Sequence, residues 1–335
     1  MDTKKKERLT NTISRRQILR EMGIVSLGAA AGLVGIGCSI PGRAVASQSA
    51  HAMPGRLKHS LVPWPFQVFG EKWDLDTACS IASDIGCTSV ELVGPDGWPT
   101  LAKYGLSCAI APNGMPGPAY VKGLNNTGYH EEVIERTSNM IETAARAPVK
   151  VSSVIAFTGF KYRNAEDPAS DVIDPEEGAN NTIAGLKKLA LLAERHGVDI
   201  CLEHLNSRVT GDDYRGHPGY QGDDIDYCVN IIRRVGSPRV KLLFDIYHVQ
   251  IMNGDIISRI REYGTDLIGH IHTAGVPGRT ELDDKQEINY PPIMQSLLDI
   301  GYTGYIGHEF IPTSDPVTGL REAISVCEGN RQEGV

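Results

Sequence analysis

The sequence lacks an excess of positive charge. Its 335 residues include 33 Lys and Arg against 41 Asp and Glu, which gives a formal net charge of −8. A protein that binds nucleic acid usually presents a basic face that displaces counterions from the phosphates, so this charge argues against such a partner. The sequence also contains no GxGxxG and no Walker motif, which are common features of nucleotide-binding sheets.

A cysteine pattern of the metal-binding type is absent as well. Cys38 lies in the N-terminal segment, and the other six cysteines are scattered without CxxC spacing. Most of them lie within apolar segments, so we expect small buried core residues rather than a disulfide framework. These six are Cys79, Cys87, Cys108, Cys201, Cys228 and Cys327.

The first 46 residues differ in composition from the rest. They begin basic and polar, contain the pair Arg15-Arg16 and continue into the apolar stretch GIVSLGAAAGLVGIG, which is too short and glycine-rich for a typical membrane-spanning helix. Ala44 and Ala46 fit a small-x-small cleavage site, and the segment resembles a twin-arginine (Tat) export signal. An arginine pair ahead of an anchor helix is the alternative. We expect residues 1–46 to direct export through the Tat translocase and to be removed, leaving a periplasmic or secreted protein.

Strand-like and helix-like segments alternate from residue 57 to residue 330. This alternation predicts a parallel sheet covered by helices. Eight such units match a single (β/α)₈ (TIM) barrel domain over residues 57–330, and an open doubly wound sheet is the alternative. The predicted strands lie at 58–66, 88–94, 107–112, 151–159, 198–206, 240–248, 267–275 and 305–312. Helical patterns lie at 74–85, 131–145, 178–196, 224–235 and 290–300.

Four successive strands of this barrel each run from apolar residues into one metal-ligand type. The fifth to eighth strands carry Glu203, Asp245, His272 and Glu309 in turn. Active sites of (β/α)₈ barrels lie at the carboxyl ends of the strands, where these side chains should meet. Unpaired buried carboxylates are costly, so a shared cation is the simplest reason for such a set.

The chemistry of this set predicts the kind of metal. Three carboxylates and one imidazole form an oxygen-rich site that suits one Mn²⁺, Mg²⁺ or Co²⁺ ion with open positions for substrate oxygens. A structural zinc site would need more sulfur or nitrogen ligands and four closed positions. His248 follows Asp245 by three residues and is a candidate to contact substrate or to support a ligand.

Three stretches resemble the hydroxypyruvate isomerase branch of the xylose isomerase-like TIM barrels. They are FDIYHVQIMNGD, GHIHTAGVPGRTE with the following EINY, and GYTGYIGHEFIP. The superfamily also includes ketose 3-epimerases and inosose dehydratases, and the resemblance covers roughly residues 57–330. It implies that Glu203, Asp245, His272 and Glu309 bind the metal. The chain has His272 where hydroxypyruvate isomerases commonly have Gln, and it has Glu203-His204 where they have Glu-Pro.

The residues predict proton abstraction next to a carbonyl in a sugar or keto-sugar. Glu203 and Glu309 lie three strands apart and could act as catalytic acid and base on two faces of a substrate, through an enediolate that the metal stabilises. Arg279 and His248 are candidate substrate-binding residues, and Trp64 is a candidate apolar wall. Glu91 is a candidate support for a ligand.

Two other functions fit the same residues. One is a lyase, such as a dehydratase of a keto-inositol or an enzyme that cleaves 3-keto-glycosides, because elimination begins with the same proton abstraction. The other is a non-enzymatic periplasmic protein that binds a sugar. The sequence leaves open whether the chain forms a homo-oligomer.

The export signal generates the first testable prediction. Mature protein isolated from the periplasm of the native host should begin after Ala46, because the Arg15-Arg16 pair and the Ala44–Ala46 site fit a cleaved signal. N-terminal sequencing provides the measurement. A mature chain that begins near Met1 would contradict the prediction.

Overall fold

Eight parallel strands form one sheet in the computed structural model, which describes residues 56–211 and 214–329. The strands are β1 Lys58–Leu61, β2 Ser89–Val90, β3 Cys108–Ala111, β4 Val151–Ala156, β5 Asp199–Glu203, β6 Val240–Asp245, β7 Ile268–Thr273 and β8 Tyr305–His308. β1 pairs with both β2 and β8, and the remaining strands pair in chain order. The amide of Val90 donates to the carbonyl of Ser107 at 3.0 Å, which closes the ring between β2 and β3. The predicted (β/α)₈ barrel is confirmed.

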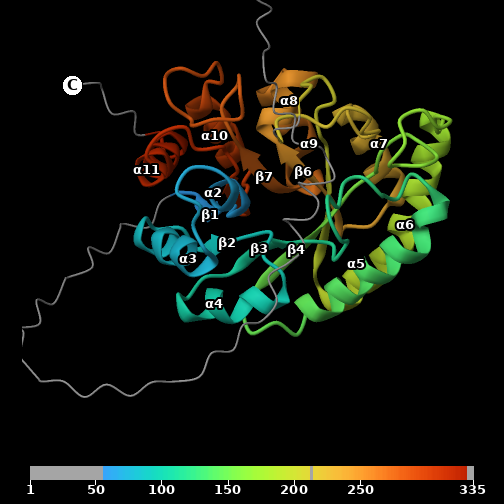
Figure 1. Cartoon of the computed structure of the whole chain (residues 1–335), viewed down its shortest axis with the longest axis horizontal. Coiled ribbons are helices and arrows are strands. Elements are labelled where there is room, and N and C mark those ends of the chain that lie inside the picture. The colour runs from blue at the N-terminus through green and yellow to red at the C-terminus, as the bar shows by residue number, and fades with distance from the viewer. Residues whose placement is uncertain (1–55, 212–213, 330–335) are drawn as a thin grey trace, which may run out of the picture. The chain divides into compact units, whose positions relative to one another are not determined.

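Helices surround the strands (Figure 1). They are α2 Trp64–Val68, α3 Leu75–Asp84, α4 Trp98–Lys103, α5 His130–Ala144, α6 Pro175–His196, α7 Ile225–Val235, α8 Ile246–Met252, α9 Ile256–Leu267, α10 Tyr290–Asp299 and α11 Pro316–Cys327. No helix in the described part of the chain is long and apolar enough to cross a membrane. The predicted export signal lies outside the described residues.

The longest helix, α6, shows how local sequence sets element boundaries. The Asp174 side chain accepts a hydrogen bond from the amide of Glu176 at 2.9 Å and so caps the helix at its N-terminus, where Pro175 occupies the first position. Gly197 ends the helix at φ +68°, a left-handed conformation that glycine adopts without a Cβ penalty. The apolar side of α6 includes Leu186 and Leu189, which are fully buried in the core.

Several predicted strand segments extend past the observed strands. Segment 58–66 is a strand only to Leu61, and helix α2 begins at Trp64. Pro63 and Pro65 lack the N–H that a central strand needs, while a proline near the start of a helix is tolerated. Strand β2 is also short, so Glu91 follows the strand instead of lying inside it.

The six cysteines of the described chain are all free and buried. This confirms that they are core residues. Burial raises the pKa of Cys201 to about 12, so its thiol stays protonated at neutral pH.

Candidate metal centre

The structure brings together the four side chains predicted as ligands. Each of Glu203, Asp245, His272 and Glu309 offers one atom, and these atoms all lie within 4.8 Å of one another. Asp245 pairs directly with His272 across β6 and β7. The Glu309 amide donates to the carbonyl of Thr273 at 3.0 Å, which aligns the end of β8 with the end of β7. Parallel strands that end at one rim therefore deliver all four groups to one place.

The two carboxylate oxygens of Asp245 have different surroundings. Its Oδ1 accepts from the amide of Tyr247 at 2.8 Å and so caps helix α8 at its N-terminus. Its Oδ2 is buried and has no hydrogen bond, with Arg279 Nη2 at 3.6 Å and His248 Nε2 at 3.5 Å. The backbone therefore orients this carboxylate while leaving one oxygen free for a cation.

Glu309 is anchored by two other side chains. Arg279 Nη2 donates to its Oε2 at 2.5 Å, and the indole Nε1 of Trp64 donates to its Oε1 at 2.6 Å. The Arg279 guanidinium is buried and lies 5.4 Å from the ring centres of both Trp64 and Tyr247. Arg279 and Trp64, both predicted to contact substrate, thus lie beside a candidate ligand.

Glu203 has a different environment. Its Oε1 lies 3.6 Å from Nδ1 of His272, a longer separation than those that hold the Glu309 carboxylate. Burial and the neighbouring carboxylates of Glu309 and Asp245 raise the pKa of Glu203 to about 7. Burial acts in the same direction on Glu309, but Arg279 and His272 outweigh it and lower the pKa of that residue. The pKa values of the two glutamates are therefore shifted in opposite directions.

His248 lies on the first turn of helix α8, not on the strand. Its Nδ1 accepts from the amide of Asn206 at 3.0 Å, and burial lowers the pKa of the ring well below its ordinary value. The neutral ring therefore carries its proton on Nε2. That atom is buried without a hydrogen-bond partner, and it can donate to a substrate oxygen.

Four buried polar atoms around the centre lack a hydrogen bond. They are two donors and two atoms that can bind a cation: Arg279 Nε, His248 Nε2, Asp245 Oδ2 and His272 Nδ1. His272 Nδ1 lies 3.0 Å from Glu309 Oε2 but outside hydrogen-bonding geometry. Buried polar atoms are normally satisfied, so the arrangement fits a bound cation and a polar substrate. The oxygen-rich ligand set fits a divalent metal.

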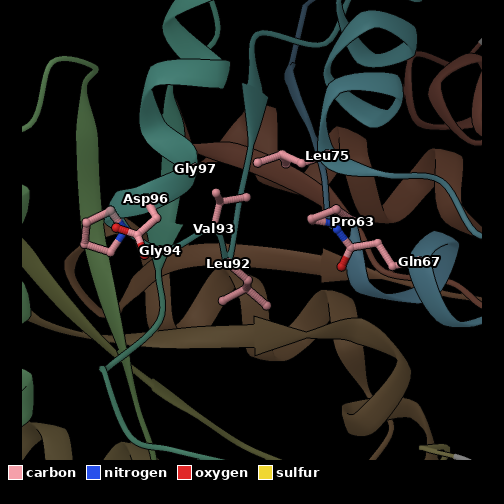
Figure 2. A pocket seen from close by; sticks show the side chains of 9 residues that line it. Pro63, Gln67, Leu75, Leu92, Val93, Gly94, Asp96 and Gly97 are labelled. Carbon is pink, nitrogen blue, oxygen red and sulfur yellow. The ribbon is translucent and has the colours of Figure 1, made fainter. Parts of the chain in front are cut away.

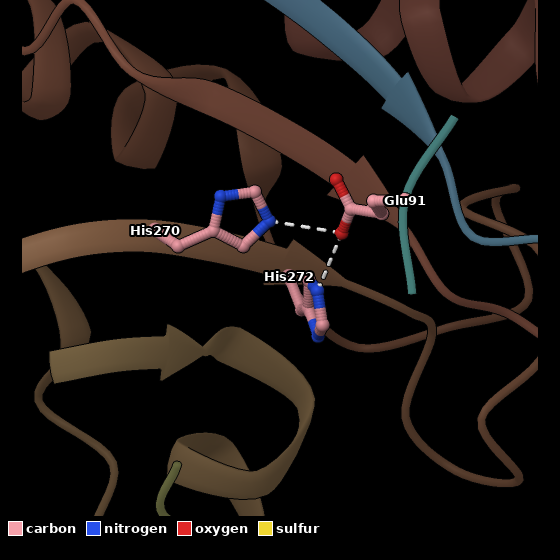
Figure 3. A group of neighbouring side chains, drawn as sticks. All are labelled: Glu91, His270 and His272. Atoms are coloured by element: carbon pink, nitrogen blue, oxygen red, sulfur yellow. Dashed lines mark hydrogen bonds and ion pairs between the residues drawn. The ribbon is translucent and has the colours of Figure 1, made fainter. Parts of the chain in front are cut away.

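A second group of side chains lies behind the centre. Glu91 Oε1 is 2.7 Å from Nε2 of His272 and 2.9 Å from Nε2 of His270 (Figure 3). Sequence analysis predicted Glu91 as a support but missed His270. The HxH spacing in β7 is the signal that could have found it, because residues two apart on a strand face the same side.

Sequence analysis also missed His217 at the mouth of the barrel. Its imidazole is 6% exposed and lies 5.5 Å from the ring of His248, edge-on to Tyr120 at 4.3 Å. Burial, with Arg279 nearby, lowers the pKa of His217 to about 3, so the ring is neutral. It comes from the loop between β5 and α7.

Two loops meet across the mouth. Arg279 Nη1 donates to the carbonyl of Tyr214 at 2.8 Å, and Arg215 Nε donates to the carbonyl of Gly278 at 2.7 Å. The Tyr214 ring also lies 5.3 Å from that of Trp64. These contacts join the β5–α7 loop to the β7–α10 loop and to α2, beside the candidate ligand Glu309.

A hollow of about 290 Å³ lies near the ends of β1 and β2 (Figure 2). Pro63 and Gln67 line one side, and Leu92 and Val93 another. None of the four ligands lines this hollow, which is therefore distinct from the metal centre.

The ligand geometry generates a prediction on metal content. Each single alanine variant should bind well below one equivalent of Mn²⁺, where the wild type binds one, because each lacks one of four converging ligands. The four positions are Glu203, Asp245, His272 and Glu309. Elemental analysis after gel filtration gives the stoichiometry. Asp199→Ala is the matched control, because Asp199 lies at the opposite end of β5 and pairs with Arg239. Unchanged stoichiometry in all four variants would refute the centre.

The protonation of Glu203 generates a second prediction. Metal competes with the proton on this carboxyl, so Mn²⁺ affinity should fall as the pH falls through its raised pKa of about 7. A single linked proton gives about a tenfold loss per pH unit below that pKa. Titrations at pH 8, 7 and 6 provide the measurement. Constant affinity over this range would contradict the prediction.

The sequence relatives of this chain include proteins that are named as isomerases. One relative is a Homo sapiens protein that is assigned as a hydroxypyruvate isomerase by inference. It is 40% identical to this chain over 119 residues, which are 36% of this chain and 40% of that protein. A 2-oxo-tetronate isomerase of Pectobacterium atrosepticum is 28% identical over 243 residues, 71% of this chain and 87% of that protein. The chain spans about half the length of this human relative and of those from Xenopus laevis, Danio rerio and Mus musculus, between 40% and 54%.

Solved structures show the same fold. The 3-keto-D-glucoside 4-epimerase of E. coli has a TM-score of 0.61 at 15% identity, covering 82% of this chain and all of that one. The IOLI protein with a bound zinc atom has a TM-score of 0.58 at 18% identity, covering 82% and 96%. Residues 79–328 match the family model described as xylose isomerase-like TIM barrel. The chain therefore belongs to the xylose isomerase-like TIM-barrel family.

Proposed function

We propose that the protein is a divalent-metal-dependent isomerase or epimerase of a small hydroxy-carbonyl compound, such as a sugar or keto-sugar. The observation that carries this proposal is the cluster of buried unsatisfied atoms around four converging ligands. Relatives named as isomerases of hydroxypyruvate and 2-oxo-tetronate support the reaction class. Glu203, Asp245, His272 and Glu309 would hold the metal, and Mn²⁺, Mg²⁺ or Co²⁺ suits their oxygen-rich set.

A bound divalent cation supplies electrostatic stabilisation for the negative charge that develops on substrate oxygens. Glu203 takes the proton from the carbon next to the carbonyl, because burial raises its proton affinity. Glu309 faces the same space from β8 and returns a proton, with Arg279 and Trp64 controlling its position. The opposed pKa shifts of the two glutamates fit this division of roles.

Three further groups are placed to orient the substrate. His248 presents a proton on Nε2, and Arg279 presents an unpartnered Nε–H. The neutral ring of His217 lies beside His248 at the mouth. These groups can hold hydroxyl or carbonyl oxygens, and the Trp64 ring beside Arg279 can form an apolar wall.

We also propose that the protein is exported by the Tat pathway and acts in the periplasm or outside the cell. The Arg15-Arg16 pair and the Ala44–Ala46 cleavage site support this location. Tat substrates cross the membrane folded, which would allow the metal to be loaded before export.

The mechanism predicts the effect of amide substitutions. Glu203→Gln and Glu309→Gln should each reduce turnover by about 10²–10⁴-fold, because an amide retains a ligand oxygen but cannot carry the proton. Metal content should fall less than in the alanine variants. Glu135→Gln on the exposed surface of α5 is the control and should leave turnover unchanged.

The assay incubates the Mn²⁺-loaded protein with hydroxypyruvate, 2-oxo acids and a panel of keto-sugars in D₂O. Deuterium on the carbon beside the carbonyl identifies the substrate. Deuterium with a rearranged product indicates an isomerase or epimerase, and loss of a β substituent indicates a lyase. Near-normal turnover of both glutamine variants would show that the glutamates act as ligands alone. Absence of exchange with every compound would favour a binding protein.

A further inference from the structure

Behind the candidate metal centre, one carboxylate oxygen of Glu91 accepts hydrogen bonds from two imidazoles. Glu91 Oε1 lies 2.7 Å from His272 Nε2 and 2.9 Å from His270 Nε2, and all three side chains are at most 2% exposed (Figure 3). The two rings meet edge-to-face, with centres 5.0 Å apart at 86°. Both come from the HxH stretch of β7, while Glu91 arrives from the end of β2 on the other side of β1 and β8.

These contacts determine which nitrogen of His272 faces the candidate ligands. A carboxylate only accepts hydrogen bonds, so Nε2 of His272 must carry a proton toward Glu91. Nδ1 then points to the other ligands, 3.0 Å from Glu309 Oε2 and 3.6 Å from Glu203 Oε1. A neutral ring held in this way offers its Nδ1 lone pair to a cation.

Gly307 leaves the space in which Glu91 contacts the two histidines. A Cβ atom at Gly307 would lie within contact distance of Glu91 Oε1 and 2.8 Å from Cδ2 of His272. Gly307 pairs with His272 across β7 and β8, so a side chain there would fill the space that the carboxylate uses. The absence of a side chain at residue 307 is thus required for Glu91 to reach its two partners.

We propose that Glu91 is a positioning residue that fixes the His272 ring and thereby sets the metal affinity of the centre, and that His270 holds Glu91 in place. Glu91, His270 and His272 are close enough to hold a second ion. However, both Nε2 atoms are already hydrogen-bonded to Glu91, so the arrangement favours positioning. This inference depends on the proposed metal centre but not on the reaction.

The test is a Mn²⁺ titration of the full protein followed by electron paramagnetic resonance. Glu91→Gln places an amide opposite His272 and should weaken Mn²⁺ binding about 10–100-fold, the range typical for partners of metal-ligating histidines. His270→Gln leaves the carboxylate but removes its second contact, so the loss should be smaller. Glu281→Gln is the matched control, because Glu281 is a buried carboxylate that accepts from Thr313 and Ser314 and contacts none of the ligands.

The double variant separates positioning from a general loss of stability. His270→Gln should add little to the loss in Mn²⁺ affinity once Glu91→Gln is present, because His270 acts through Glu91. Glu281→Gln should lower the melting temperature while Mn²⁺ affinity stays within about twofold of the wild type. In the Mg²⁺-loaded protein, ¹⁵N NMR should show a protonated Nε2 on His272, and this signal should change in Glu91→Gln.

Three outcomes would overturn the proposal. If folded Glu91→Gln binds Mn²⁺ within about twofold of the wild type, Glu91 does not position the ligand. If the wild type binds two equivalents and Glu91→Gln binds one, the three residues form a second metal site. If the wild type binds no Mn²⁺, the proposed metal centre fails together with this inference, whereas normal metal binding without turnover would reject only the proposed reaction.

Discussion

Burial of like charges is the constraint on which the rest of the structure depends. Glu203, Asp245 and Glu309 bring three carboxylates within 4.8 Å of one another, inside a barrel where each is at most 5% exposed. Removing a charged group from water still costs several kcal/mol after relaxation, so such a cluster persists only with compensation. The protein provides part of it through Arg279 and the backbone cap on Asp245. The remaining free oxygens leave room for a cation.

The same charges organise the loops. Arg279 binds Glu309 with one nitrogen and the carbonyl of Tyr214 with another, so a single guanidinium links the centre to the β5–α7 loop. The rings of Trp64 and Tyr247 flank the guanidinium and limit its movement. In (β/α)₈ barrels the strand ends commonly supply a rigid rim and the loops add further groups, and here the candidate ligands lie at strand ends while Arg279 lies in a loop.

Most of the barrel and the core of the site could be predicted from the sequence because both depend on local patterns. Apolar runs that end in Glu203, Asp245, His272 and Glu309 place one ligand type at the end of each of four strands, and parallel pairing then brings the four together. The predicted helix at 178–196 ends where α6 ends, just before Gly197, whereas α6 begins three residues earlier than predicted, at Pro175. These features involve residues close in sequence or strands adjacent in the sheet.

Other features depend on contacts between distant segments. The Glu91 contact with His270 and His272 spans about 180 residues and depends on the missing side chain at Gly307. The HxH spacing marks His270 and His272 as neighbours on one side of a strand, but no local pattern shows that Glu91 contacts both of them. His217 likewise gains its position only because its loop folds back over the mouth.

The sequence by itself determined the class of fold and the four candidate ligands, because periodicity and ligand chemistry are properties of the residues themselves. The tertiary structure alone decided the different environments of the two chemically identical glutamates. Glu309 is held by Arg279 and Trp64, whereas Glu203 lies 3.6 Å from His272 and close to two like charges. Proton affinity depends on burial and neighbouring charge, and both are set only when segments distant in the chain pack together.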